Sequence, residues 1–199
     1  MKNIFKTLFA GLILLGTTVS CEESTLPIDV LYDTVDNSGA FVRTLEFPAD
    51  LIYLTAGSNG RTTSIDMTLE VQEGDGTLPP TFTELRIYQA TYDDQDLLIP
   101  TSDTNGDPLG ENLVMTLAAS EFELSEGNGL PSIEVSITGQ SVVDLYPTAV
   151  FTVPTFIATR LELQMADGRV FTNTNVGPSV ATGDFFASPF IYKTIFLNN

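Results

Sequence analysis

Three side chains that carry oxygen donors occupy alternate positions in an acidic stretch of the chain. Asp103, Asn105 and Asp107 have the i, i+2, i+4 spacing of a calcium-binding loop. Pro108 follows at the sixth position, where such a loop needs glycine, and no helical pattern flanks the segment. The alternative interpretation is a solvated acidic loop, and we expect no cofactor.

Two tyrosines could offer flat surfaces to a sugar ring. Tyr88 lies on the polar side of an alternating segment, and Tyr92 lies at its end. Aromatic rings that face solvent can stack on ligands, so these two are the candidates for ligand stacking. The alternative is that they are ordinary aromatic residues of a strand.

The residues needed for common enzymatic chemistry are missing. The chain has no histidine, the commonest general base and zinc ligand, and no tryptophan. Serines occur without a G-x-S-x-G motif, and nothing selects one pair of carboxylates for glycoside hydrolysis. We therefore predict that the protein is not an enzyme and has no catalytic residues.

The single cysteine, Cys21, stands at the end of a secretion signal. Lys2 and Lys6 precede an apolar run from Leu8 to Leu15, which is too short to span a bilayer. Residues 18–21 (TVSC) resemble the lipobox of bacterial lipoproteins, in which the cysteine thiol is lipidated, although Thr18 stands where leucine is usual. The alternative is a secreted protein with a free N-terminal thiol.

An acidic pair, Glu22 and Glu23, follows the cysteine directly. Its position is similar to that of the export signal of surface lipoproteins in Bacteroidota-type bacteria. We expect a lipid-anchored protein of the outer membrane that faces the cell surface. The alternatives are a periplasm-facing protein and a merely soluble linker behind the lipid.

Removing residues 1–20 changes the formal net charge from −18 to −20, because only Lys2 and Lys6 leave with them. So acidic a chain is not expected to bind nucleic acid, which requires clustered basic residues. We divide the chain into a signal peptide (1–20), a lipidated tether (21–38) and one elaborated sandwich (39–199). Two small β domains split near residues 126–131 are the alternative.

Alternation with period two dominates the mature chain and predicts an all-β fold. In Ser64–Gln72 every second residue is apolar, which is typical of a half-buried antiparallel strand. We expect an antiparallel β-sandwich with an immunoglobulin or fibronectin III-like strand order and no substantial helix outside the signal peptide. The other expected strands are Ala40–Phe47, Thr83–Tyr92, Leu113–Leu117, Phe122–Leu124, Ser132–Thr138, Ala149–Val153, Phe156–Met165, Arg169–Thr172 and Phe190–Leu197.

One hairpin can be placed from its turn. Asp167 and Gly168 separate two alternating segments, and an Asp-Gly pair is typical of a two-residue type I′ turn. We therefore expect the segment after Gly168 to fold back on the strand before Asp167.

Three segments together resemble a known group of proteins. They are Tyr32–Leu45 (YDTVDNSGAFVRTL), Leu161–Phe171 (LELQMADGRVF) and Phe185–Lys193 (FFASPFIYK). With the lipobox, they are similar to the small surface lipoproteins that accompany SusC/SusD-type outer-membrane transporters, loosely those of the SusE/SusF group. The resemblance implies a transporter protein as partner and a polysaccharide as ligand, and it carries no catalytic residues.

Overall fold

The computed structural model describes residues 39–57, 60–177, 180 and 188–198. All of them belong to one compact unit, Ser38–Asn199. Cys21, Tyr32 and the rest of the signal and tether lie outside the described residues. None of the described helices is long and apolar enough to cross a bilayer.

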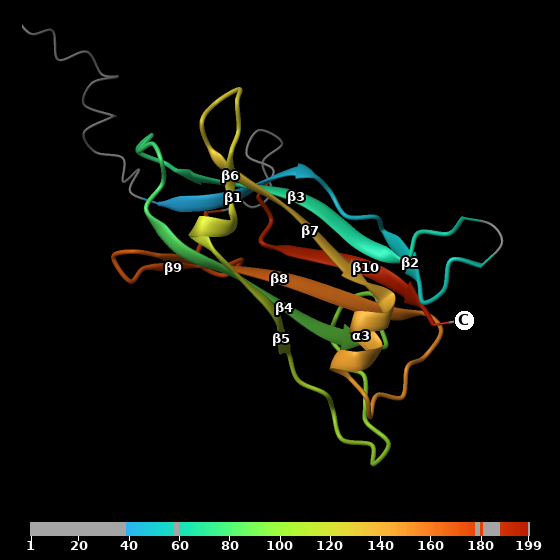
Figure 1. Ribbon diagram of the computed structural model, residues 1–199. Coiled ribbons are helices and arrows are strands. Elements are labelled where there is room, and N and C mark those ends of the chain that lie inside the picture. The colour runs from blue at the N-terminus through green and yellow to red at the C-terminus, as the bar shows by residue number, and fades with distance from the viewer. Residues whose placement is uncertain (1–38, 58–59, 178–179, 181–187, 199) are drawn as a thin grey trace, which may run out of the picture. The chain divides into compact units, whose positions relative to one another are not determined.

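Two β-sheets make up the described part of the chain (Figure 1). The four-stranded sheet has the order β1 (Ala40–Glu46), β3 (Ser64–Glu73), β7 (Pro131–Thr138) and β6 (Glu123–Leu124). The six-stranded sheet has the order β2 (Leu51–Tyr53), β10 (Ile191–Leu197), β8 (Thr155–Met165), β4 (Phe82–Tyr92) and β5 (Asn112–Ala118), and β9 (Val170–Phe171) pairs with β8.

The strand order is that of an immunoglobulin-like sandwich. If the strands are lettered along the chain as A, A′, B, C, C′, D, E, F and G, with β9 left out, the four-stranded sheet reads A-B-E-D. The other sheet reads A′-G-F-C-C′. The predicted all-β sandwich is therefore confirmed, and both sheets contain strands from either side of residues 126–131.

The alternating patterns bury their apolar side chains between the sheets. On β3 the buried apolar residues are Ile65, Met67, Leu69 and Val71, as the sequence predicted, and Glu70 and Glu73 are buried as well. The apolar residues of β3 pack with apolar residues of β4, β8 and β10 in a single cluster. The chain has one cysteine and no tryptophan, and this core is filled by aliphatic side chains, methionines and the rings of phenylalanines and tyrosines, of which Phe190 and Phe196 are fully buried.

One strand pairing is not antiparallel. β2 pairs in parallel with β10, with Ile52 opposite Phe196. β2 has only three residues, which are too few to show alternation, so the strand was not predicted from the sequence. Conversely, the strand expected at Ala149–Val153 does not form, and Ala149 makes only an isolated bridge to Asp103.

Short helical segments lie between some of the described strands. A 3-10 turn, η2 (Ala119–Glu121), joins β5 to β6, and one α-helix, α3 (Gly139–Leu145), follows β7. Thr138 caps α3, because its Oγ1 accepts a hydrogen bond from the Ser141 N–H at 3.1 Å. Seven residues are too few to show a 3.6-residue period, so this helix was not predicted.

The predicted hairpin forms, but with a different turn. Leu163 pairs with Phe171 and Gln164 with Val170, and the Met165 N–H donates to the Arg169 carbonyl. The loop thus has three residues, 166–168, rather than two. Only Gly168 has positive φ, at 89°, as in a three-residue hairpin loop rather than a type I′ turn.

Candidate binding surface

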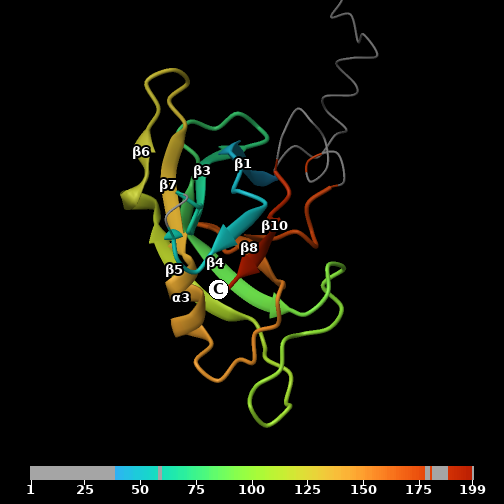
Figure 2. The same cartoon turned by 90° about the vertical axis from the view of Figure 1, so that its right-hand side faces the viewer.

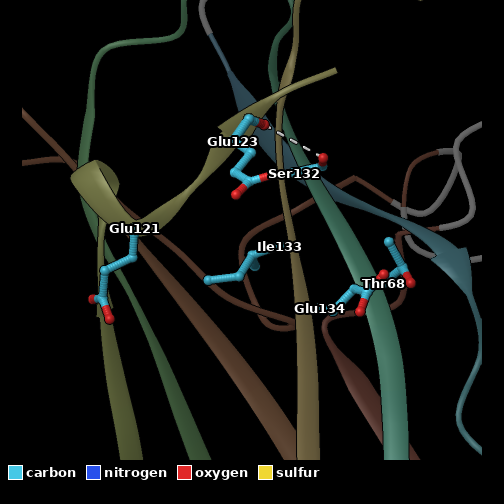
Figure 3. Close-up of a pocket in the computed structure, with 6 residues that line it drawn as sticks. All are labelled: Thr68, Glu121, Glu123, Ser132, Ile133 and Glu134. Carbon is cyan, nitrogen blue, oxygen red and sulfur yellow. Dashed lines mark hydrogen bonds between the residues drawn. The ribbon is translucent and has the colours of Figure 1, made fainter. Parts of the chain in front are cut away.

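A hollow of about 350 Å³ opens beside the edge of β7, and we call it the edge hollow (Figure 3). Strands β3, β6 and β7 and the turn η2 contribute to it. Glu134 and Ile133 leave β7 on opposite sides, so the hollow lies on both sides of this strand. Its lining residues are Thr68, Glu121, Glu123, Ser132, Ile133 and Glu134.

A second hollow, of about 360 Å³, lies next to the first on the outer face of the four-stranded sheet, and we call it the face hollow. The two share Thr68 and Glu134, so they form one continuous depressed surface. Successive side chains along a strand point to opposite faces of the sheet. On β3 and β7 the residues that alternate with the core positions are mostly polar, so polar side chains gather on this outer face. The face hollow is lined by Glu46, Asp66, Met67, Thr68, Glu134, Val135 and Ser136.

Hydroxyl groups position two of the carboxylates. The Asp66 carboxylate accepts hydrogen bonds from Ser136 Oγ at 2.6 Å and from Ser64 Oγ at 2.7 Å. Thr68 Oγ1 donates to Glu46 Oε2 at 3.1 Å. Such a set of carboxylates and hydroxyls can bind the hydroxyl groups of a ligand or its positive charges.

The acidic groups of this surface lack basic partners. None of the carboxylates of Glu46, Asp66, Glu121, Glu123 and Glu134 forms an ion pair within the part of the chain that the structure describes. The glutamates at 46, 121, 123 and 134 are all exposed. The surface therefore carries uncompensated negative charge.

The outer face of the six-stranded sheet is different, because its arginines and glutamates are paired with one another. Arg160 binds the Glu111 carboxylate with two nitrogens, at 2.8 and 2.7 Å, and also contacts Glu162 at 3.2 Å. The hydrogen bonds that Arg160 donates to the Glu111 carboxylate raise the pKa of Arg160, although partial burial opposes this. Arg86 likewise pairs with Glu84 and, at 3.5 Å, with Glu162.

Tyr88 lies on this paired face, on the polar side of β4 as the sequence predicted, but one side of its ring is occupied. The Arg160 guanidinium carbon lies 4.4 Å from the ring centroid, which is a cation–π contact. Its cross-strand neighbour on β8 is the same Arg160. A sugar could stack only on the other side of the ring.

Tyr92 is at the end of β4 and is half-buried. Phe156 stands opposite it on β8, and Pro100 bridges to it from the following loop. Tyr88 and Tyr92 share a face but are separated by Ala90, so their Cα atoms are about 13 Å apart along the strand. Both tyrosines remain candidates for ligand stacking, on the sheet opposite the two hollows.

Of the three candidate oxygen donors in the acidic loop, Asp103 is engaged by the loop itself. Asp103 accepts hydrogen bonds from the N–H groups of Asn105 at 2.8 Å and of Asp107 at 2.9 Å, and from the Asn105 side chain at 3.1 Å. The bond from Asp107 is the main reason why the pKa of Asp103 is lowered. No cluster of three or more potential metal-ligating His, Cys, Asp or Glu residues occurs among the described residues.

Sequence reasoning did not single out the residues of the edge hollow. Alternation placed Glu134 and Thr68 on outer faces, which the structure confirms. However, Glu121 and Glu123 reach the hollow through η2 and the two-residue strand β6, neither of which shows a period. A run of three acidic residues at 121, 123 and 126 beside an alternating strand was the available signal.

Comparison with known proteins adds no identification. The sequence matches no family model, and a search among curated proteins finds no match.

Proposed function

We propose that this protein is a non-catalytic, lipid-anchored accessory or binding subunit of a SusC/SusD-type nutrient uptake system in the outer membrane. The observation that carries the proposal is the uncompensated acidic surface formed by the edge hollow and the face hollow. Unpaired charge and free hydrogen-bonding groups on a rigid sheet are suited to contact a partner or a polar ligand. The lipobox-like residues 18–21 would hold this surface near the membrane.

The geometry of the carboxylates supports binding rather than hydrolysis. A glycosidase needs two carboxyl groups facing each other across the substrate, one of them with a raised pKa. The glutamates of the edge hollow are exposed to solvent. A binding role requires only that their charge and hydrogen-bonding capacity be accessible.

Copurification tests the proposal. The full chain with a C-terminal tag would be isolated from detergent-solubilised membranes, and the proteins that remain bound would be identified. We expect an outer-membrane transporter pair in stoichiometric amount. A chain that always elutes alone would contradict the proposal, and Cys21→Ser, which prevents lipidation, separates anchoring from association.

A second candidate function is a stand-alone glycan-binding module on the cell surface. It is favoured by the hydroxyl and carboxylate groups of the face hollow, which match the hydroxyls of a sugar. Affinity electrophoresis against a panel of polysaccharides tests it. Tyr88→Ala and Tyr92→Ala should abolish retardation if the tyrosines stack on the sugar, whereas Asp66→Asn should abolish it if the face hollow binds.

A further inference from the structure

Most of β7 forms an open edge of the four-stranded sheet. β6 pairs with β7 only at Ser132 and Pro131. From Ile133 to Thr138 no other strand of the described chain pairs with β7 on the side away from β3. Figure 2 shows β7 along one margin of the sheet, with β6 beyond its upper part.

The direction of the backbone groups of β7 follows from one hydrogen bond. The Gly139 N–H donates to the Thr63 carbonyl at 2.7 Å, in register with the β3–β7 ladder. Because hydrogen-bonded pairs alternate in an antiparallel ladder, residues 133, 135 and 137 bond to β3. Glu134 and Ser136 therefore direct their N–H and C=O groups to the open edge, where no strand of the described chain meets them.

The other edges of the sandwich are less suited to receive a strand. The pairing of β5 with β4 has a register shift after Ile87 of β4. The pairing of β1 with β3 has one between Thr44 and Glu46 of β1. Such irregularities are a common protection of sheet edges. β2 has only three residues. β7, in contrast, keeps an unbroken register with β3 from Ser132 to Thr138.

The surroundings of this edge define the chemistry of an added strand. On the outer face its side chains would lie beside Glu134 and the other unpaired carboxylates of the hollows. On the inner face they would lie beside Ile133, which is half-buried. A strand that alternates basic and apolar residues matches both faces.

Two occupants from this protein itself fit poorly. A second copy would bring another Glu134 to the edge of a chain whose net charge is −18, so like charges would face each other. Residues 22–38 contain five acidic residues and no lysine or arginine, so they cannot supply the basic side chains. The charges favour a different protein.

We propose that the open edge of β7 binds an extended segment of a partner protein, with alternating basic and apolar residues, as an added β-strand. The backbone of Glu134 and Ser136 would provide the ladder, and the unpaired carboxylates would select the basic side chains. The inference deepens the proposed function. It rests on that function in one respect only, namely that a protein partner exists. It holds whether or not that partner is a SusC/SusD-type transporter.

A synthetic peptide tests this site directly. A fluorescent nine-residue peptide of alternating lysine and valine would be titrated with the purified full chain, and anisotropy would report binding. We expect saturable binding that weakens as salt is raised. The same peptide with glutamate in place of lysine should not bind, and a peptide methylated on alternate backbone amides should bind at least about tenfold more weakly.

Variants of one residue separate the backbone from the side chain. Ser136→Pro removes an N–H that faces the open edge and leaves the bonds to β3 intact, so we expect a loss of at least about tenfold in affinity. Ser136→Ala is the matched control and should change affinity by less than about twofold. Glu134→Gln should weaken binding by about twofold to fivefold at low salt.

The outcomes distinguish this proposal from the proposed function. The proposal is overturned if the wild-type chain does not bind the lysine–valine peptide, or if the methylated peptide binds as well as the unmodified one. Because the methylated peptide is tested on the wild-type chain, the result stands even if Ser136→Pro fails to fold. Peptide binding without any copurified transporter would contradict only the proposed function.

Discussion

The hydroxyl of Tyr192 on β10 lies 2.6 Å from the hydroxyl of Thr44 on β1, and both residues are buried. The two strands belong to different sheets, so this hydrogen bond joins the sheets through the interior. Burial raises the pKa of Tyr192 to about 12, although the hydrogen bond with Thr44 acts in the opposite direction. The protein therefore contains a phenol that resists ionisation in the folded state.

Stability should fall in strongly alkaline solution because of this phenol. In the unfolded chain a tyrosine ionises near pH 10, whereas folded Tyr192 keeps its proton until about pH 12. The unfolded state thus binds fewer protons between these values, and the free energy of unfolding decreases as the pH rises. The contribution of Tyr192 is fully present below about pH 10, and about 2–3 kcal/mol is lost by pH 12.

Urea denaturation at several pH values checks this expectation. Tyr192→Phe should show a flatter decline than the wild type between about pH 10 and pH 12. Thr44→Val is the control, since it removes the hydrogen bond but leaves a buried phenol, and it should keep the alkaline decline. Equal slopes for Tyr192→Phe and the wild type would show that other groups cause the loss.

The ion pair between Arg43 and Glu70 should stabilise the four-stranded sheet. Arg43 Nη2 lies 2.8 Å from Glu70 Oε1, and Glu70 is only 1% exposed. The Asn128 side chain donates a further hydrogen bond to Glu70 at 2.8 Å. Arg43→Ala would leave a buried carboxylate with one polar partner, so we expect a loss of about 2 kcal/mol in unfolding free energy, reduced by the partial exposure of Arg43.

A second substitution tests the reason for that loss. Glu70→Gln in the Arg43→Ala background replaces the uncompensated charge by a neutral amide and should recover about half of the lost stability. Chemical denaturation of the two variants and the wild type gives the values. A double variant no more stable than Arg43→Ala would show that the lost packing of the arginine, rather than the buried charge, is responsible.

Gly139 should not tolerate a side chain. A Cβ at this position would lie 2.9 Å from the Tyr53 carbonyl oxygen and 3.2 Å from the Leu54 Cα, both backbone atoms. Gly139→Ala is thus expected to destabilise the fold by about 1–3 kcal/mol through overpacking, despite the better helix propensity of alanine. Gly110→Ala is the control, since a Cβ at that position would have no heavy atom within 4 Å beyond the adjacent residues. Similar thermal midpoints for the two variants would contradict this prediction.

Cys21→Ser should release the protein from the membrane. If the thiol carries the lipid, the variant should appear in the soluble fraction and lose incorporation of radiolabelled palmitate. Ser20→Ala, which keeps the cysteine, should remain in the membrane fraction. Digestion of intact cells by an added protease then distinguishes the surface-facing from the periplasm-facing location. A palmitate-free wild-type protein would support the alternative of a secreted chain with a free thiol.

The parts of the fold that follow from local alternation could be predicted from the sequence. Ile65 and Met67 alternate with Asp66 and Thr68, so their burial and the outward direction of Asp66 and Thr68 were evident. The same rule places Tyr88 on the outer face of β4. It cannot reveal that Arg160 covers the ring, because that contact depends on the pairing of β4 with β8.

The binding surface could not be predicted from alternation, because it depends on how separate segments of the chain meet in the fold. Glu121 and Glu134 belong to a 3-10 turn and a strand, and only the crossing from one sheet to the other brings them to the same hollow. The parallel strand at Ile52 was missed for a similar reason, since its partner Phe196 is near the other end of the chain. Short elements are specified by tertiary contacts rather than by their own periodicity.

Because charges are paired unequally on the two sheets, negative charge is distributed unevenly between the two outer faces of the sandwich. Arginines compensate the glutamates of the six-stranded sheet, whereas the five carboxylates around the hollows have no basic partner among the described residues. A negatively charged lipid surface would repel the face that carries the hollows more strongly than the outer face of the six-stranded sheet. This repulsion acts within about 8 Å, the Debye length at physiological salt. A molecule held at such a surface by its N-terminus would therefore turn the face that carries the hollows outward, toward whatever approaches from solution.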